Sequence, residues 1–146
     1  MFSLIISIIS IALVAALAAA TVYFGGAAFN KGGAGADAST FINAGQQIAG
    51  AFTLAEVDAD VAVTDVSSLA PHYLAQAPTY KGAEFVLSED VDTDYVKITV
   101  NTDDICTEIN KRANGVDSSG DPADVIAVDG LYGCVTADKT AFYKVK

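Results

Sequence analysis

The chain has 146 residues, and its 18 acidic side chains against 8 basic ones give a formal net charge of −10 at pH 7. This acidic balance argues against binding nucleic acid or an anionic membrane through charge. The length leaves room for an anchor and one small domain of about 120 residues, and not for two domains.

Residues 1–24 form an apolar run without charge, proline or glycine. As a helix this run would rise ~36 Å, which exceeds the ~30 Å hydrocarbon core of a bilayer. A removable secretory signal would carry a basic start and a shorter apolar stretch, and the first basic residue here is Lys31. We therefore expect a membrane-spanning helix. Because the usual basic flank is missing, we also expect that a charged leader has been cut off ahead of Met1.

The anchor carries small residues at four-residue spacing, which lets helices approach closely in lipid. Alanine is also a common filler of any apolar helix, so the pattern alone leaves both close packing and simple anchoring open. The candidate packing residues are Ser3, Ser7, Ala12, Ala15, Ala16, Ala19 and Ala20.

Residues 25–36 are predicted to form a flexible joint. Each glycine inside a helix costs about 1 kcal/mol relative to alanine, so we expect a kinked, extended or locally unwound segment. Such a segment would help a helix to leave a bilayer and repack in an assembly, and a plain flexible linker is the alternative. The glycines concerned are Gly25, Gly26, Gly32, Gly33 and Gly35.

Residues 37–56 are predicted to continue the helix with one apolar face. Phe41, Ala44, Ile48 and Phe52 recur at three- and four-residue steps, with Leu54 or Ala55 next. The remaining residues, 57–146, are expected to form an acidic globular head.

The head begins with a loop, residues 61–80, which contains one short helical turn that Ser67 or Ser68 could cap. Two β-rich runs follow, AEFVLS and DYVKITV, and the acidic segment EDVDT between them indicates a hairpin. A helix is then predicted in TDDICTEINKRANG, capped by Thr102 or Asp103.

The chain closes with the loop VDSSGDPADV and two short strands, GLYGCVT and TAFYKVK, separated by the turn residues ADK. The predicted class is therefore α+β, with a long N-terminal helix packed on a small antiparallel sheet.

The two cysteines, Cys106 and Cys134, belong to a chain that is expected to cross a membrane. An oxidising compartment favours a disulfide over a metal site there. Closing a loop of that length would contribute about 3 kcal/mol. Both cysteines should therefore lie outside the cytoplasm.

No pattern in the sequence points to catalysis, a cofactor or a metal. Asp90, Asp92 and Asp94 have the spacing that begins a calcium loop, but Tyr95 replaces the glycine at the sixth place, and Asn101 the glutamate at the twelfth. A second acidic set, formed by Asp117, Asp121 and Asp124, is similar, and solvated turns explain both sets better. The lone His72 has no second histidine to complete a site. We therefore expect no enzyme activity, no cofactor and no small-molecule substrate.

Taken together, these features resemble the type IV pilins of bacteria, and among them the class b subgroup. The likeness is carried by the start in Met1-Phe2, the helix that continues through INAGQQIAGAFTLAEVD, the segment SSLAPHYLAQAP, and a cysteine in each of the last helix and the final strand region.

The resemblance implies a subunit that polymerises into an extracellular filament, with the apolar helix at the centre. It also implies a methylated N-terminus at Met1 and two kinds of partner besides further copies of the chain, a leader peptidase and an inner-membrane assembly machinery. It does not say which surface, nucleic acid or phage the head contacts.

One position departs from the family. Pilins usually have a glutamate at the fifth mature position, where it meets the N-terminal amine of a neighbour, and this chain has Ile5. Two alternatives therefore stay open. The chain could be a single-pass membrane protein with an extracytoplasmic binding domain, or a minor pilin or pseudopilin of a secretion machine.

Overall fold

The computed structural model describes residues 2–58, 63–89, 94–113 and 130–146. The chain divides into two compact units, Met1–Gly33 and Ala34–Lys146, and the second unit is the head. The boundary falls inside the predicted glycine-rich joint. The acidic segments that were compared with calcium loops lie outside the described residues, except Asp94, and so does the loop VDSSGDPADV.

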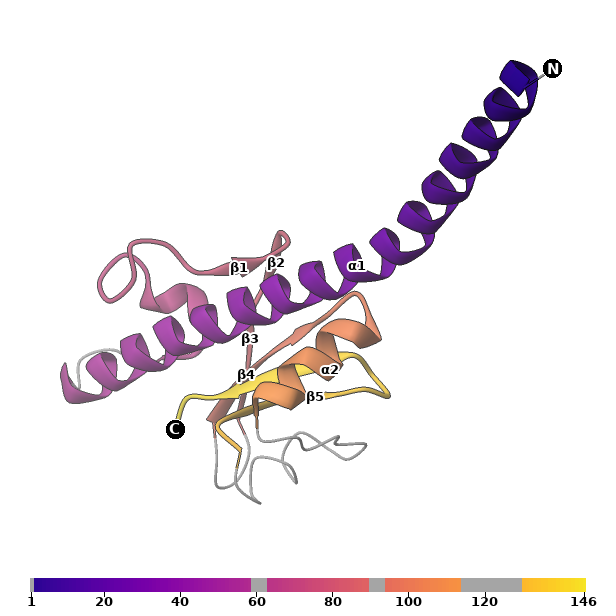
Figure 1. Cartoon of the computed structure of the whole chain (residues 1–146). Helices are drawn as coiled ribbons and strands as arrows, with labels where there is room; N and C mark the ends of the chain where they lie inside the picture. Colours follow the sequence, from indigo (N-terminus) through magenta and orange to yellow (C-terminus); the bar gives the residue numbers. More distant parts are fainter. Residues whose placement is uncertain (1, 59–62, 90–93, 114–129) are drawn as a thin grey trace. The chain divides into compact units, whose positions relative to one another are not determined.

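A single helix, α1, runs from Phe2 to Asp58 and contains 57 residues (Figure 1). All five glycines of the predicted joint lie within it, so the expected extended or unwound segment is not observed. Glycine weakens a helix by freeing the unfolded chain, but its backbone makes the same helical hydrogen bonds as any other residue. A glycine-rich segment can therefore be helical and still be the least stable part of the helix.

From Ala34 onward, α1 supplies the core of the head. Phe41, Ile48 and Ala55 are completely buried, and Phe41 stacks on Phe85 with ring centroids 6.0 Å apart. The predicted apolar face is thus confirmed. Its last member is Ala55 and not Leu54, whose side chain is 57% exposed.

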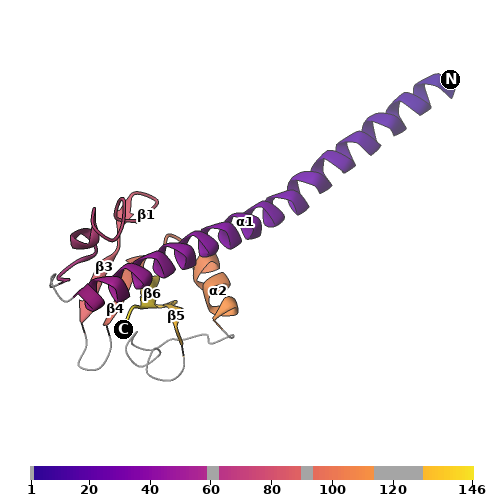
Figure 2. The same cartoon turned by 90° about the vertical axis from the view of Figure 1, so that its left-hand side faces the viewer.

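The head contains a four-stranded antiparallel sheet in the order β3-β4-β6-β5. Its strands are β3 (Val86–Glu89), β4 (Asp94–Thr99), β5 (Tyr132–Val135) and β6 (Thr140–Lys144). The predicted hairpin is confirmed in its main part, because β3 pairs with β4, but the run AEFVLS is not one strand, since Ala83–Glu84 belong to β2. The two strands predicted at the end of the chain are confirmed and pair as β5 with β6. The β4–β6 pairing joins the two hairpins, and the head part of α1 lies across one face of the sheet (Figures 1 and 2).

Alternation along the strands gives the sheet two different faces. Val96, Ile98 and Tyr143 belong to the main core, which includes the head part of α1. Tyr95 and Phe142 point the other way and form a second small cluster with a third residue, Val135. We call the face that bears Tyr95 the outer face.

The remaining elements of the head are short. Residues Val66–Leu69 form the 3-10 turn η1, Thr79–Tyr80 and Ala83–Glu84 pair as β1 and β2, and Asp103–Arg112 form the helix α2.

The caps of η1 and α2 differ in how well the sequence predicts them. The Asp65 side chain caps η1 by accepting from the Ser68 backbone N–H at 2.8 Å, so the prediction that Ser67 or Ser68 is the cap was wrong. The pKa of Asp65 is lowered, first by the hydrogen bond from Ser67 and then by the one from the Ser68 backbone. Thr102 is the N-cap residue of α2, as one of the two predicted candidates, although its side chain makes no capping hydrogen bond.

A close approach between α1 and β6 requires a glycine. A Cβ atom built on Gly45 would lie 2.9 Å from the Tyr143 Cβ and closer still to the ring, whereas one built on Gly50 would meet nothing within 4 Å. The missing side chain of Gly45 therefore sets how closely the helix packs on the sheet.

This contrast gives a matched pair of substitutions in one helix. Gly45→Ala should destabilise the head by about 1–3 kcal/mol, because the added methyl overpacks the helix–sheet interface. Gly50→Ala should instead stabilise it by up to about 1 kcal/mol, since alanine is the better helix former and the position is open. Urea unfolding of the full chain in detergent, followed by tyrosine near-UV circular dichroism, measures both. Equal effects of the two changes would contradict the packing described for Gly45.

Candidate functional site

The first part of α1 exposes apolar side chains on every side. Every large apolar side chain from Phe2 to Phe24 is exposed, from 52% for Ile5 to 85% for Phe2. A continuous apolar surface of this extent is far larger than the patches that soluble monomers expose. The surface is therefore a site of contact with lipid or with other protein.

The helix α1 is long and apolar enough to cross a membrane, and it is the one helix of this kind in the part of the chain that the structure describes. The core helix of a soluble protein can pass the same test, but the apolar window of α1 is not buried at all. A signal sequence near an N-terminus can also pass it, so length and composition alone establish a capacity to span.

Three hydroxyl groups in this part of α1 donate to carbonyls of the helix itself. Ser7 donates to the Ser3 carbonyl at 3.0 Å, Ser10 to the Ile6 carbonyl at 2.8 Å, and Thr21 to the Ala18 carbonyl at 2.9 Å. A hydroxyl that bonds to its own helix can enter an apolar environment without losing a partner. These polar residues therefore do not oppose burial in lipid or in a helical assembly.

The candidate packing residues fall on two sides of the helix. Because an α-helix advances about 100° per residue, Ser3 and Ser7 lie on one side, opposite to the alanines. Two opposite strips of small residues would let more than one neighbouring helix approach at once. The alanine strip consists of Ala12, Ala15, Ala16, Ala19 and Ala20.

The glycines of the predicted joint differ in their surroundings. A Cβ built on Gly25, Gly26, Gly32 or Gly33 would meet nothing within 4 Å. Gly35 belongs to the head, because Arg112 of α2 donates from Nη2 to the Gly35 carbonyl at 3.0 Å and from Nη1 to the Ser39 hydroxyl. No contact within the described chain therefore requires Gly25, Gly26, Gly32 or Gly33. Gly35 lies where Arg112 of α2 contacts α1.

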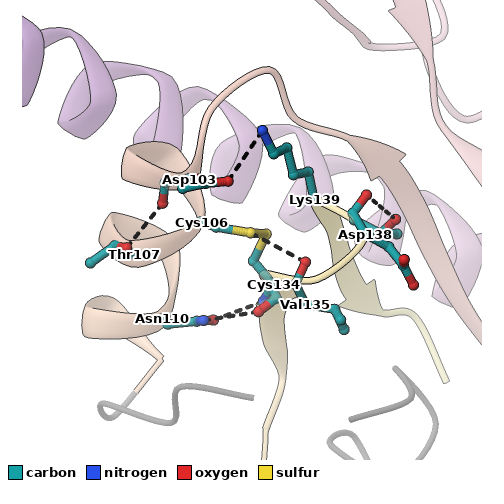
Figure 3. The surroundings of a disulfide bond; sticks show 9 residues. Asp103, Cys106, Thr107, Asn110, Cys134, Val135, Asp138 and Lys139 are labelled. Carbon is teal, nitrogen blue, oxygen red and sulfur yellow. Dashed lines mark hydrogen bonds and ion pairs between the residues drawn. A yellow bond between two sulfur atoms is a disulfide. The ribbon is translucent and has the colours of Figure 1, made fainter. Parts of the chain in front are cut away.

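The disulfide joins α2 to β5, as Figure 3 shows. Cys106 and Cys134 are bonded with their Cα atoms 5.1 Å apart, and both residues are completely buried. The pairing predicted from the sequence is confirmed.

Asn110 completes this junction and was not foreseen from the sequence. Its side-chain amide donates to the Cys134 carbonyl at 2.9 Å and accepts from the Cys134 backbone N–H at 2.8 Å. The residue is 4% exposed, so the two bonds satisfy an amide that would otherwise be costly to bury. β5 is an edge strand, and Asn110 occupies its free edge in place of a further strand. The sequence feature that could have indicated this role is the position of Asn110, one turn after Cys106 on the same, buried side of the predicted helix.

Ion pairs lie at the surface of the head, including one between α1 and the β1–β2 turn and one within α2. Lys81 lies 2.6 Å from Asp37, and Lys111 lies 2.7 Å from Glu108. The hydrogen bond that Lys81 donates to the Asp37 carboxylate raises the pKa of Lys81. The lysines are exposed and the carboxylates only partly buried, so the pairs contribute little stability individually.

The described residues hold no cluster of three or more His, Cys, Asp or Glu side chains that could bind a metal. His72 is exposed at the surface of the loop that follows η1. Met1, the predicted modified terminus, lies outside the described residues.

Comparisons of the chain with protein-family models, curated proteins and solved structures found no match. The long apolar helix, the small antiparallel sheet and the disulfide are compatible with a pilin-like fold. Membership of the pilin family is accordingly a proposal that rests on architecture.

Proposed function

We propose that the chain is a structural subunit that polymerises into an extracellular filament of the type IV pilus kind. The observation that carries this proposal is the apolar surface of residues 2–24, exposed on all sides of a helix whose later part forms the core of the head. A filament would bury this surface in a bundle of identical helices and leave the heads outside.

The membrane would hold the subunit before assembly. Lipid tails can cover the apolar side chains, and polymerisation would replace those lipid contacts with contacts between helices. In lipid the hydrophobic effect does not drive helices together, so close packing at small residues has to supply the gain. The serine and alanine strips on opposite sides of α1 support this exchange.

The head would cover the filament core and face the solvent. The disulfide and Asn110 hold α2 against the sheet, which suits a domain outside the cytoplasm. Leader removal, a methylated Met1 and an inner-membrane assembly machinery are parts of the same proposal.

Ile5 favours a second candidate function, that of a minor pilin or pseudopilin. No acidic side chain occurs in α1 before Asp37, so the N-terminal amine of a neighbour would find no carboxylate in the filament core. A subunit at the tip of a filament needs no partner above it, and a minor pilin or pseudopilin is therefore the second candidate.

A chimera separates a filament subunit from a membrane protein with a plain anchor. Residues 2–24 would be replaced by an unrelated spanning helix of similar length and hydropathy that lacks the small-residue strips. Cells producing each chain would be sheared, and the released material sedimented. The natural chain should appear in the sheared pellet, and the chimera should stay in the membrane fraction. A natural chain found only in the membrane fraction would contradict the proposal.

A further inference from the structure

The outer face of the sheet carries a groove of about 540 Å³. Its polar lining residues are Glu84, Lys97, Thr99, Asp138 and Thr140, and Tyr95 forms part of its floor. This volume lies within the range of ~300–1,000 Å³ that small-molecule sites occupy. The groove lies on the face opposite to α1 and belongs to the head alone.

Lys97 is the one basic residue of this lining. Within the described residues, Lys81, Lys111, Lys139 and Lys146 each have a carboxylate within ion-pair distance, whereas Lys97 has none, as is also true of Lys31 and Lys144, which lie outside the groove. Its ammonium has one weak hydrogen bond, to the Ser88 hydroxyl at 3.4 Å. Lys97 is thus a half-buried cation with no carboxylate at ion-pair distance among the described residues, in a chain whose net charge is −10.

Protection of a sheet edge does not explain this lysine. Lysine on an edge strand prevents pairing with other chains, but β4 is an inner strand that lies between β3 and β6. Lys97 is also one residue from Val96 and Ile98, which face the main core, so its position in the groove is fixed by the register of the sheet.

The remaining polar groups indicate what else a ligand must offer. The carboxylates of Glu84 and Asp138 accept hydrogen bonds, and the hydroxyls of Thr99 and Thr140 both donate and accept. A ligand that suits this lining has one anionic group for Lys97 and several hydroxyls for the other residues. A polyphosphate carries several negative charges, which one lysine beside two carboxylates would not balance, whereas a single carboxylate matches the single charge of Lys97. A neutral sugar would leave Lys97 without an anionic partner in the groove.

We propose that the groove binds an acidic sugar of the uronic acid class, whose carboxylate pairs with Lys97 and whose hydroxyls contact Glu84, Asp138 and the two threonines. This binding function goes beyond the proposed filament and does not depend on polymerisation. The sequence alone predicted no small-molecule partner, because the groove residues come from three separate stretches of the head, 83–86, 95–99 and 135–140.

The experiment is a titration of the full chain in detergent micelles with D-glucuronate and, separately, with D-glucose. Backbone amide NMR of Lys97, Thr99 and Thr140 reports the site. The proposal predicts that these amides shift with glucuronate and that the dissociation constant for glucose is at least about tenfold higher, because a charge-assisted bond is missing.

Three variants test the role of the lysine. Lys97→Gln should weaken glucuronate binding by about tenfold or more, and Lys97→Arg should largely retain it. Lys111→Gln removes an equal charge on α2, outside the groove, and should leave the affinity unchanged. Amide spectra of each variant show whether the head is folded. No glucuronate-dependent shift at these amides, equal affinity for both sugars, or equal effects of the two glutamine variants would overturn the proposal.

Discussion

Replacement of Ala16 by phenylalanine should abolish filaments while the head stays folded. Ala16 lies on the alanine strip of α1, in the unit that precedes the head. A phenyl ring there would hold neighbouring helices apart, and the packing gain that drives association in lipid would be lost. The measurement is the amount of sheared, sedimentable chain, together with near-UV circular dichroism of the purified variant.

Leu17→Phe is the matched control for this change. It places the same ring one residue along the helix, at a position that already bears a large apolar side chain, 64% exposed. This variant should still insert in membranes and should assemble far better than the Ala16 variant. Normal filaments from Ala16→Phe would count strongly against a close-packed helical core.

Removal of the disulfide should lower the stability of the head by about 3 kcal/mol. Replacement of both Cys106 and Cys134 by alanine avoids leaving a free thiol or an unpaired hydroxyl in a fully buried site. The head should still fold, since Asn110 continues to bond to the backbone of residue 134 and the four-stranded pairing does not depend on sulfur. Urea unfolding monitored by tyrosine signals measures the loss, because the chain contains no tryptophan.

The natural chain in the presence of a reductant provides the control for the double variant. Both samples should unfold at a similar urea concentration, which would assign the loss to the covalent link and not to the alanines. Alkylation of two thiols in the native, unreduced protein would contradict the disulfide itself.

Periodicity predicted the elements that bury a regular face. The three- and four-residue spacing of Phe41, Ala44 and Ile48 identified the buried side of α1, and the alternation in AEFVLS and DYVKITV identified the β3–β4 hairpin. These patterns are local, so a single sequence contains them in full. The pairing of the two cysteines was expected on other grounds, because a chain that crosses a membrane places its head in an oxidising compartment.

Features that depend on contacts between distant segments could not be read in this way. The amide of Asn110 resembles any polar side chain of a helix until β5 is placed beside it. Gly45 differs from Gly50 only because Tyr143, nearly a hundred residues further along the chain, packs against the first and not the second. The β1–β2 hairpin was not predicted. Its turn residues Lys81 and Gly82 both adopt the left-handed conformation of a tight turn, with φ of 50° and 82°, and Gly82 was the one sequence signal for it.

The glycine-rich segment shows that helix propensity alone does not predict where a helix is interrupted. The cost of several glycines predicted an interruption at residues 25–36, yet α1 is helical throughout them. Propensity sets how stable a helix is, whereas its continuation depends also on the strong helix formers on either side.

Electron microscopy of material sheared from the cell surface, with intact mass spectrometry of its main protein, tests directly whether the chain forms an extracellular filament. The proposal predicts thin filaments whose subunit mass is that of this chain, or of the chain with a methylated N-terminus. Filaments that lack the chain, or a chain that never leaves the membrane fraction, would show that residues 2–24 are only an anchor.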